Sequence, residues 1–179
     1  MEHPNDTTAS QLREIQEVAI KALRAQPSLG VGTATTIAKI TSGLTCNLED
    51  SQWKFIADEM PDDGGAGLGP DPGVYGRAAL ASYLAMGYVF WAARLAVALT
   101  NVEVTVEADY DARGMLGLDD SISPGWTAIR YRVRIESSAS ESKINEVVEI
   151  ADRYSPLLED FRQPIPVTRE LEVKHSQVD

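Results

Sequence analysis

The sequence predicts an α+β fold in one domain that spans residues 1–179. Residues 73–100 form a long stretch of mostly apolar residues, which is typical of a buried core helix. Residues 102–109 and 129–135 instead alternate between apolar and polar side chains, which is typical of half-buried β-strands. The chain shows no internal repeat and no break in composition, so its helices and strands are expected to share one core.

The N-terminal part of the chain is expected to form one helix and three strands. Thr8 and Gln11 have the spacing of a capping box, and apolar residues recur at helical spacing over residues 10–25, up to Pro27. Alternating apolar and polar residues then predict three strands joined by short turns, within residues 31–41, 44–49 and 53–57. Cys46 falls on the apolar face of the second strand.

A glycine-rich loop leads into the long apolar helix. The loop over residues 59–71 is acidic at first and then rich in glycine. Asp71 can cap the helix, and Pro72 suits its first turn. Gly76 and Gly87 each lower helix propensity by about 1 kcal/mol relative to Ala. Close packing would account for these glycines, and the run of small residues along the helix would let another helix approach within the subunit and across a dimer axis.

The C-terminal part is predicted to contain two paired strands, a helix and a last strand. The polar face of residues 102–109 is acidic and that of residues 129–135 is basic. Antiparallel pairing would place opposite charges side by side, and each such pair contributes roughly 0.2–1 kcal/mol. A helix is expected over residues 140–154, a helical turn over 157–161 and a strand over 165–173. The predicted order is thus α-βββ-α-ββ-α-β.

The composition excludes several classes of partner. The formal net charge is −11, so nucleic acid and anionic membrane surfaces would be repelled and neither is expected as a partner. Cys46 is the single cysteine, which excludes an internal disulfide. His3 and His175 lie in polar ends of the chain, and residues 1–9 and 175–179 are expected to be flexible tails. The charge-free part of the apolar stretch is shorter than the roughly 20 residues that span a bilayer. With no secretory signal at the N-terminus, a cytoplasmic location is expected.

Residue patterns that could mark a catalytic or metal site favour structural roles. The glycine-rich run over residues 64–69 lacks the spacing of a dinucleotide fingerprint, and the acidic residues before it would repel phosphate. Asp62 and Asp63, and likewise Asp119 and Asp120, are typical of solvated turns. Neither a metal site nor a cofactor is expected. A cysteine on an apolar strand face is more often inert than reactive.

The order of several segments points to one known family. The loop and the long helix read GGAGLGPDPGVYGRAALASYLAMGYVFWAARL over residues 64–95. They are followed by VEVTVEADYDARG, IRYRVRIES, ADRYSP and QPIPVTRELEV. Over nearly its whole length the chain resembles the OsmC/Ohr family of osmotically inducible and organic-hydroperoxide-resistance proteins, and its N-terminal helix resembles one subgroup. The resemblance implies an intertwined homodimer whose central helices pack together, with a hydroperoxide-reducing cysteine pair at the subunit interface.

Both cysteine positions that the resemblance implies carry other residues here. The family's attacking cysteine lies at a fixed distance after the turn proline, and counting from Pro72 leads to Tyr83. The resolving cysteine precedes a proline after the later helix, and that place is Ser155. The family's glutamate after the turn would fall at Gly73 or Val74. A cycle of thiolate, sulfenic acid and disulfide needs two sulfurs within reach, so this cycle is expected to be absent.

We therefore expect a dimeric OsmC-like protein that has kept the pocket and lost the peroxidase activity. A small apolar or oxidised molecule would bind between the subunits, with Tyr83 at the former thiol site. The alternative is a one-cysteine peroxidase, in which Cys46 forms a sulfenic acid that an external thiol resolves. A third reading is a structural or interaction protein with a fully packed interface. The candidate binding residues are Tyr83, Ser155, Cys46 and Arg77.

Overall fold

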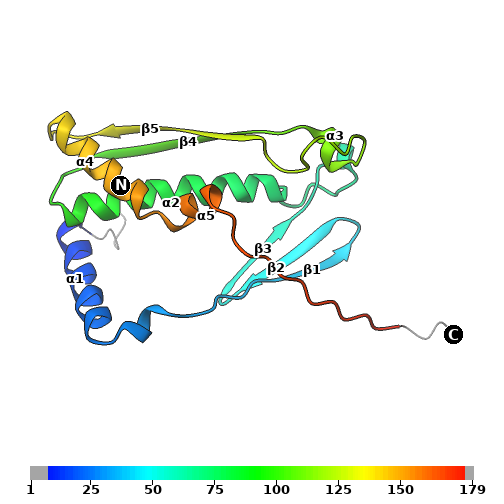
Figure 1. Cartoon of the computed structure of the whole chain (residues 1–179), viewed down its shortest axis with the longest axis horizontal. Helices are drawn as coiled ribbons and strands as arrows, with labels where there is room; N and C mark the ends of the chain where they lie inside the picture. The colour runs from blue at the N-terminus through cyan, green and yellow to red at the C-terminus, as the bar shows by residue number, and fades with distance from the viewer. Residues whose placement is uncertain (1–7, 176–179) are drawn as a thin grey trace.

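A computed structural model describes residues 8–175 of the chain. The elements in chain order are α1 (Ala9–Ala25), η1 (Pro27–Gly30), β1 (Ile37–Ser42), β2 (Thr45–Asp50), β3 (Trp53–Ala57), η2 (Pro61–Asp63), α2 (Pro72–Arg94), β4 (Asn101–Asp109), α3 (Ala112–Met115), β5 (Ala128–Glu136), α4 (Glu141–Arg153) and α5 (Pro156–Arg162). Figure 1 shows α2 running along the β4-β5 sheet, with α4 and α5 beside it. The β1-β2-β3 sheet lies apart from this layer, and α1 extends from the C-terminal end of α2. The α+β class is confirmed. Within the described part of the chain, no helix is long and apolar enough to cross a membrane.

Strands β4 and β5 form the antiparallel pair that the charge pattern predicts. Glu103 lies opposite Arg134 and Glu107 lies opposite Arg130 in the ladder. The carboxylate oxygens lie 3.4 and 3.5 Å from the guanidinium nitrogens of their partners. Because these side chains are exposed, each pair contributes at most about 1 kcal/mol. Their main effect is on register, since a slip of one residue would turn the apolar face of the strand to water.

Helix α2 begins where the sequence predicts and ends earlier than expected. The Asp71 side chain caps it, because Oδ1 accepts a hydrogen bond from the Val74 amide at 3.0 Å. The apolar stretch continues to residue 100, but the helix ends at Arg94. Ala96 adopts a left-handed φ of 54°, which turns the chain toward β4. Hydrophobicity alone therefore placed the end of the helix too late.

The core of the single chain lies between α2, the β4-β5 sheet and the α4-α5 pair. Its buried members are Leu80, Leu84, Tyr88, Ala151 and Leu158. Full burial of one such leucine contributes about 1.5–3 kcal/mol. The three core residues of α2 recur every four positions, so one face of this helix is turned inward and the opposite face is left outside.

A polar group joins the three layers inside this core. The carboxylate of Asp152 on α4 accepts hydrogen bonds from the Tyr88 hydroxyl at 2.8 Å and from the Tyr131 hydroxyl at 2.6 Å. Burial, together with these bonds to Asp152, raises the pKa of Tyr131 to about 12 and raises the pKa of Tyr88 far above its ordinary value. Both phenols therefore stay protonated and act as donors at neutral pH. We call Asp152, Tyr88 and Tyr131 the tyrosine-aspartate group.

The first helix has the capping box that the sequence predicts. Thr8 Oγ1 accepts a hydrogen bond from the Gln11 amide at 3.3 Å, and Gln11 Oε1 accepts one from the Thr8 amide at 2.9 Å. The expected flexible tails, residues 1–9 and 175–179, fall mostly outside the described residues. Thr8 is already the cap of α1 and Ala9 its first residue, so these two positions do not belong to a tail.

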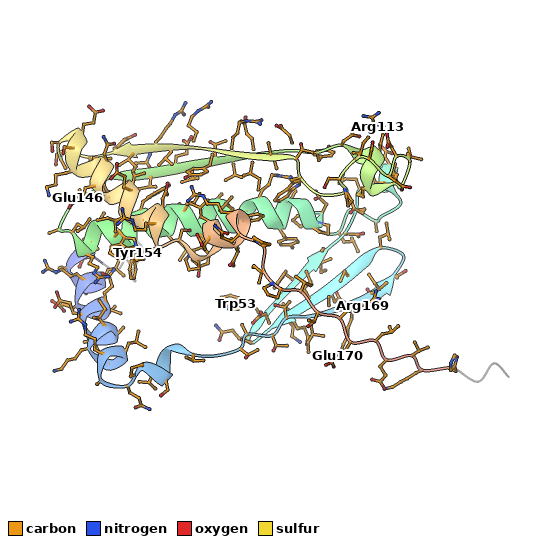
Figure 2. The ribbon with its side chains drawn as sticks, in the orientation of Figure 1. Trp53, Arg113, Glu146, Tyr154, Arg169 and Glu170 are labelled. Carbon is orange, nitrogen blue, oxygen red and sulfur yellow. The ribbon has the colours of Figure 1, made fainter. Side chains whose placement is uncertain are left out.

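The N-terminal sheet is a three-stranded antiparallel meander. Its first strand begins at Ile37, later than expected, and residues 31–36 are not part of the ladder. Every residue of β1 is exposed, and so are most residues of β3. In Figure 2, the labelled Trp53 of this sheet lies well away from Tyr154 near the core. The single chain thus leaves apolar side chains of this sheet without a cover.

The predicted last strand is wrong for the described chain. Residues 165–173 alternate apolar and polar side chains, but they run as an extended segment outside any ladder. Val167 is 91% exposed and Leu171 is 76% exposed. An alternating pattern favours extended backbone, whereas a strand also needs a neighbouring edge to bond with. Within residues 8–175 no strand edge pairs with this segment.

Replacing Asp152 should destabilise the fold strongly. Asp152→Ala leaves the buried Tyr88 hydroxyl and the Tyr131 hydroxyl without their acceptor, so we expect a loss of about 2–4 kcal/mol in the free energy of unfolding. Urea unfolding at neutral pH, followed by circular dichroism, measures this loss. Glu149→Ala on the exposed side of α4 is the matched control, and it should change the value by less than about 0.5 kcal/mol. Equal effects of the two substitutions would contradict the role of the tyrosine-aspartate group.

Candidate functional site

A groove of about 940 Å³ runs along the outward face of α2. Its walls come from the first turns of α1, the second half of α2, the turn into β4 and the junction of α4 with α5. Most of the side chains that line it are apolar or aromatic, including Met86, Phe90 and Trp91. Tyr83 and Ser155 both line it as well. We call it the apolar groove. The two positions at which the resemblance implies cysteines therefore meet in one concave surface, although they lie far apart in the sequence.

Tyr83 and Ser155 lie in different surroundings within the apolar groove. Tyr83 is 49% exposed on the outward face of α2. Ser155 is buried and is the N-cap of α5, where its hydroxyl oxygen accepts a hydrogen bond from the Leu158 amide at 3.4 Å. Serine is among the best N-cap residues, so this hydroxyl has a clear structural task. Tyr83 is the more accessible of the two to a ligand.

Aromatic rings form one wall of the apolar groove. Tyr154 stacks on Trp91 with ring centroids 5.2 Å apart and planes 25° apart. The guanidinium carbon of Arg94 lies 4.7 Å from the centroid of the Trp91 ring. Figure 2 shows Tyr154 where the end of α4 approaches α2. Sequence reasoning missed this wall, because residues 91 and 154 are brought together only by the packing of α4 on α2.

Cys46 lies outside the apolar groove of its own chain. It is half-buried on β2, opposite Ile40 of β1 and Ala57 of β3. Its sulfur lies 4.0 Å from the carbonyl oxygen of Asn47. The β1-β2-β3 sheet is separate from the layer that contains Tyr83. One chain therefore does not bring Cys46 together with Tyr83 and Ser155.

Arg77 also lies away from the apolar groove. It is half-buried near the start of α2, where its guanidinium packs close to Gly73. The Trp126 ring covers the same end of the helix, and a Cβ at Gly76 would lie 2.7 Å from it. This contact accounts for Gly76, as close packing predicts. The structure thus places Arg77 beside the start of the helix and Tyr83 in the groove.

The glycine-rich loop is held by one buried carboxylate. Asp58, which is 2% exposed, accepts hydrogen bonds from the Thr45 hydroxyl at 3.0 Å and from the backbone amides of Glu59, Ala66 and Leu68 at 2.9–3.4 Å. Burial opposes the charge, but the bonds from the loop amides and Thr45 outweigh it and hold the pKa of Asp58 below its ordinary value. This carboxylate ties the loop to the β1-β2-β3 sheet.

Two glycines of this loop are required by close contacts. A Cβ at Gly65 would lie 1.9 Å from the carbonyl oxygen of Glu59, and a Cβ at Gly69 would lie 2.2 Å from that of Ile56. Their backbone therefore approaches the end of β3 more closely than any other residue would permit. This packing explains the glycines without a bound phosphate.

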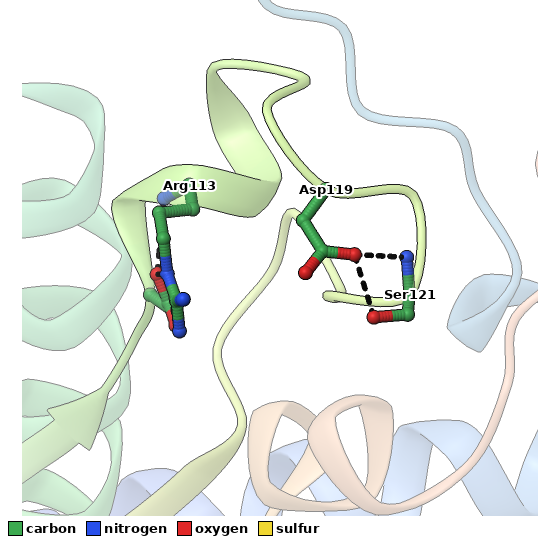
Figure 3. Close-up of polar contacts among 4 residues, drawn as sticks. Arg113, Asp119 and Ser121 are labelled. Carbon is green, nitrogen blue, oxygen red and sulfur yellow. Dashed lines mark hydrogen bonds and ion pairs between the residues drawn. The ribbon is translucent and has the colours of Figure 1, made fainter.

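The loop between β4 and β5 contains the second carboxylate pair. Figure 3 shows the Asp119 carboxylate accepting hydrogen bonds from the Ser121 amide at 2.9 Å and the Ser121 hydroxyl at 2.6 Å. The Ser121 hydroxyl and amide hold the pKa of Asp119 below its ordinary value. Arg113, which is labelled in the same view, forms an ion pair with Asp111, with 2.6 Å between Nη2 and Oδ2. These are local turn contacts, and residues 8–175 contain no group of three side chains that could hold a metal ion.

Comparisons with known proteins match the chain to one family model and to solved structures of similar fold. The family model described as OsmC-like protein matches residues 64–170. An OsmC-like protein from Mycoplasma pneumoniae superposes with a TM-score of 0.63 at 15% identity, over 74% of this chain and 89% of that one. An organic hydroperoxide resistance protein from Legionella pneumophila superposes with a TM-score of 0.56 at 17% identity, over 74% of this chain and 90% of that one. An OsmC-like protein of unknown function from Vibrio cholerae superposes with a TM-score of 0.59 at 11% identity, over 73% of this chain and 94% of that one. The comparison with curated proteins found no match.

The Asp58 carboxylate should make stability depend on pH. Its pKa is lower in the folded than in the unfolded chain, so its stabilising effect is complete above the ordinary aspartate pKa and is lost as pH falls through the folded value. Asp58→Asn should therefore lower the melting temperature at pH 7, and its difference from the native protein should shrink below about pH 4. Thermal unfolding from pH 7 to pH 3 measures both curves. Exposed Asp160→Asn serves as the control, and a pH-independent difference for Asp58→Asn would contradict the assignment.

Proposed function

The chain belongs to the OsmC-like protein family, and from this premise we propose that it is a cytoplasmic homodimer that binds a small apolar molecule without reducing peroxides. The observation that carries the proposal is the chemistry of the apolar groove. Tyr83 and Ser155, at the positions of the family's redox cysteines, both line it, and neither supplies a sulfur. The proposal therefore keeps the family's site and assigns it to binding.

The chemistry of the groove argues against a dithiol peroxidase. Peroxide reduction by a cysteine pair transfers the terminal oxygen to a thiolate, and a second thiol then displaces water from the sulfenic acid to form a disulfide. The only cysteine of the chain is Cys46, on the separate β1-β2-β3 sheet. The hydroxyl of Ser155 is already used as a helix cap. A single sulfur outside the groove does not support this cycle.

The outward face of α2 supports assembly into a dimer. Met86 is 72% exposed, Tyr83 49% and Phe90 40%, and these residues recur along one face of the helix. A Cβ at Gly87 would meet no atom of residues 8–175 within 4 Å, so the described part of the chain does not supply the close packing expected at this glycine. The exposed sheet and the extended segment over residues 165–173 add further uncovered apolar surface. A second copy related by a twofold axis would cover this face with the same face of its own α2.

The lining of the apolar groove favours an apolar ligand with at most one or two polar atoms. Its aromatic wall of Trp91 and Tyr154 offers flat apolar surface, and the Tyr83 hydroxyl supplies a donor at the exposed side. The name of the Legionella protein associates that relative with organic hydroperoxides, which are apolar molecules carrying one polar group. The ligand proposed for this chain is likewise an apolar molecule with one polar group, which the protein binds without reducing it.

The proposed dimer should depend on the outward face of α2. Met86→Arg places a charge that has no partner inside an apolar interface, so we expect the dimer dissociation constant to rise at least about 100-fold. Sedimentation velocity over a range of concentrations measures this shift. Glu149→Arg adds the same side chain on the exposed side of α4 and should leave the dimer intact. A native protein that sediments as a monomer would rule out the assembly.

Binding and peroxide consumption can be separated in one pair of assays. The native protein should bind the neutral fluorescent probe N-phenyl-1-naphthylamine saturably and should consume cumene hydroperoxide with dithiothreitol no faster than the buffer. Ala85→Trp fills the groove with an indole, so it should reduce probe affinity at least about tenfold. Fluorescence titration and an assay of residual peroxide provide the measurements.

Two controls assign the outcome of these assays. Ser142→Trp adds the same ring on the exposed side of α4 and should leave probe binding unchanged. Cys46→Ser should leave peroxide consumption unchanged. Turnover that is lost in Cys46→Ser would establish the one-cysteine peroxidase instead. Failure of the native protein to bind the probe would favour a fully packed interface with a structural role.

A further inference from the structure

All the side chains that the structure places in the lining of the apolar groove are uncharged. They are apolar or aromatic, apart from the polar side chains of Thr100, Asn101 and Ser155. Charged residues make up 24% of the chain, and a groove at the surface would be expected to include some of them. Among residues 8–175 none of them belongs to the lining. The groove is therefore uncharged as well as apolar.

The polar side chains of the lining suit a neutral ligand better than an ion. The Thr100 hydroxyl donates to the Glu136 carbonyl oxygen at 3.0 Å, and the Ser155 hydroxyl caps α5. The Asn101 amide donates to a carboxylate oxygen of Glu136 at 3.5 Å, so a negative charge lies behind this wall. Tyr83 offers a neutral hydroxyl at the exposed side, which can bond a hydroxyl or carbonyl group of a ligand. An ion loses far more hydration on burial than such a group does.

The guanidinium of Arg94 comes close to the apolar groove without lining it. Its central carbon lies 4.7 Å from the centroid of the Trp91 ring, and Trp91 belongs to the aromatic wall. Arg94 instead lines a separate, charged groove beside α1, together with Arg13 and Lys21. Its charge is therefore held at the end of α2, outside the space that a ligand of the apolar groove would fill.

From the uncharged lining we propose that the apolar groove selects an uncharged ligand, such as a long-chain alcohol, ketone or ester, over the ionised form of a fatty acid or an alkylamine. This inference rests on the proposed function, because the second copy is what would keep water out of the groove. A charged head group that enters such a space gives up its hydration and meets no opposite charge in the lining described above, which disfavours ions of either sign. A neutral head group loses less and can bond the Tyr83 hydroxyl.

Three ligands that share one alkyl chain test this selection on the native protein. At pH 7.5, 1-decanol, decanoate and decylammonium compete with N-phenyl-1-naphthylamine, each below its micellar concentration. We expect the inhibition constant of each ion to be at least about tenfold higher than that of decanol. The difference should persist in about 0.5 M sodium chloride, because salt screens long-range attraction and repulsion but does not replace lost hydration.

The two ions separate the effect of the lining from that of the net charge. The chain carries −11, which by itself would weaken the binding of decanoate and strengthen that of decylammonium. Either ion competing as well as decanol would therefore overturn the proposal. Lack of binding of the naphthylamine probe would refute the proposed binding function and this inference with it, whereas probe binding with equal competition by all three ligands would refute the selection alone.

Charge variants locate the selection in the groove. Ala9→Lys adds a cation at the exposed first residue of α1, which lines the groove, so it should lower the ratio of the decanoate to the decanol inhibition constant at least about threefold. Ser142→Lys adds the same charge on the exposed side of α4 and should keep the native ratio, and so should Arg94→Gln. A native ratio in Ala9→Lys would place the ions outside the groove, and a decanoate affinity that falls in Arg94→Gln would show that a cation already serves the site. Either result would overturn the proposal, and sedimentation velocity checks that each variant keeps the assembly of the native protein.

Discussion

The packing of one face of α2 against the β4-β5 sheet and α4 determines where the rest of the molecule lies. Leu80, Leu84 and Tyr88 fill this contact, and the Tyr88 hydroxyl fixes its depth and rotation by bonding Asp152. Because a helix repeats every 3.6 residues, fixing this face also fixes the opposite one. That opposite face carries Tyr83 and Met86 outward, and it forms the floor of the apolar groove. The position of the candidate site is thus a consequence of core packing.

The same carboxylate also fixes the opposite wall of the groove. Asp152 lies at the end of α4, held by hydroxyls from α2 and β5. The next residues, Tyr154 and Ser155, enter the groove from this fixed point, one as a ring stacked on Trp91 and the other as the cap of α5. The tyrosine-aspartate group, which does not line the groove, therefore controls the shape of its surface. Ser155, at the place where the resemblance implies a cysteine, accordingly has a structural task here as the cap of α5.

Helix α1 contributes Ala9 and Leu12 to the apolar groove, so the way it is held matters for the site. Gln16 docks this helix by bonding the carbonyl of Phe90, and Phe90 itself lines the apolar groove. This docking leaves Gln16 Oε1 buried and without a hydrogen-bond partner among residues 8–175. The start of α2 depends on a comparable buried contact, because Asp58 gathers the amides of the glycine-rich loop that leads into it. In both places one polar side chain positions a whole segment of the chain.

Local sequence was sufficient to predict the elements whose causes are local. The capping box at Thr8, the cap at Asp71 and the charge pattern that pairs β4 with β5 were all predicted, since each depends on neighbouring residues or on strict alternation. The family resemblance added that Tyr83 and Ser155 belong to one site. Tertiary structure decided what depends on distant partners: the end of α2 at Arg94, the meeting of Tyr83 and Ser155 in one groove, and the hydrogen bonds that the carboxylates of Asp58 and Asp152 accept. It also left residues 165–173 outside any ladder, because a strand exists only where another edge can accept its hydrogen bonds.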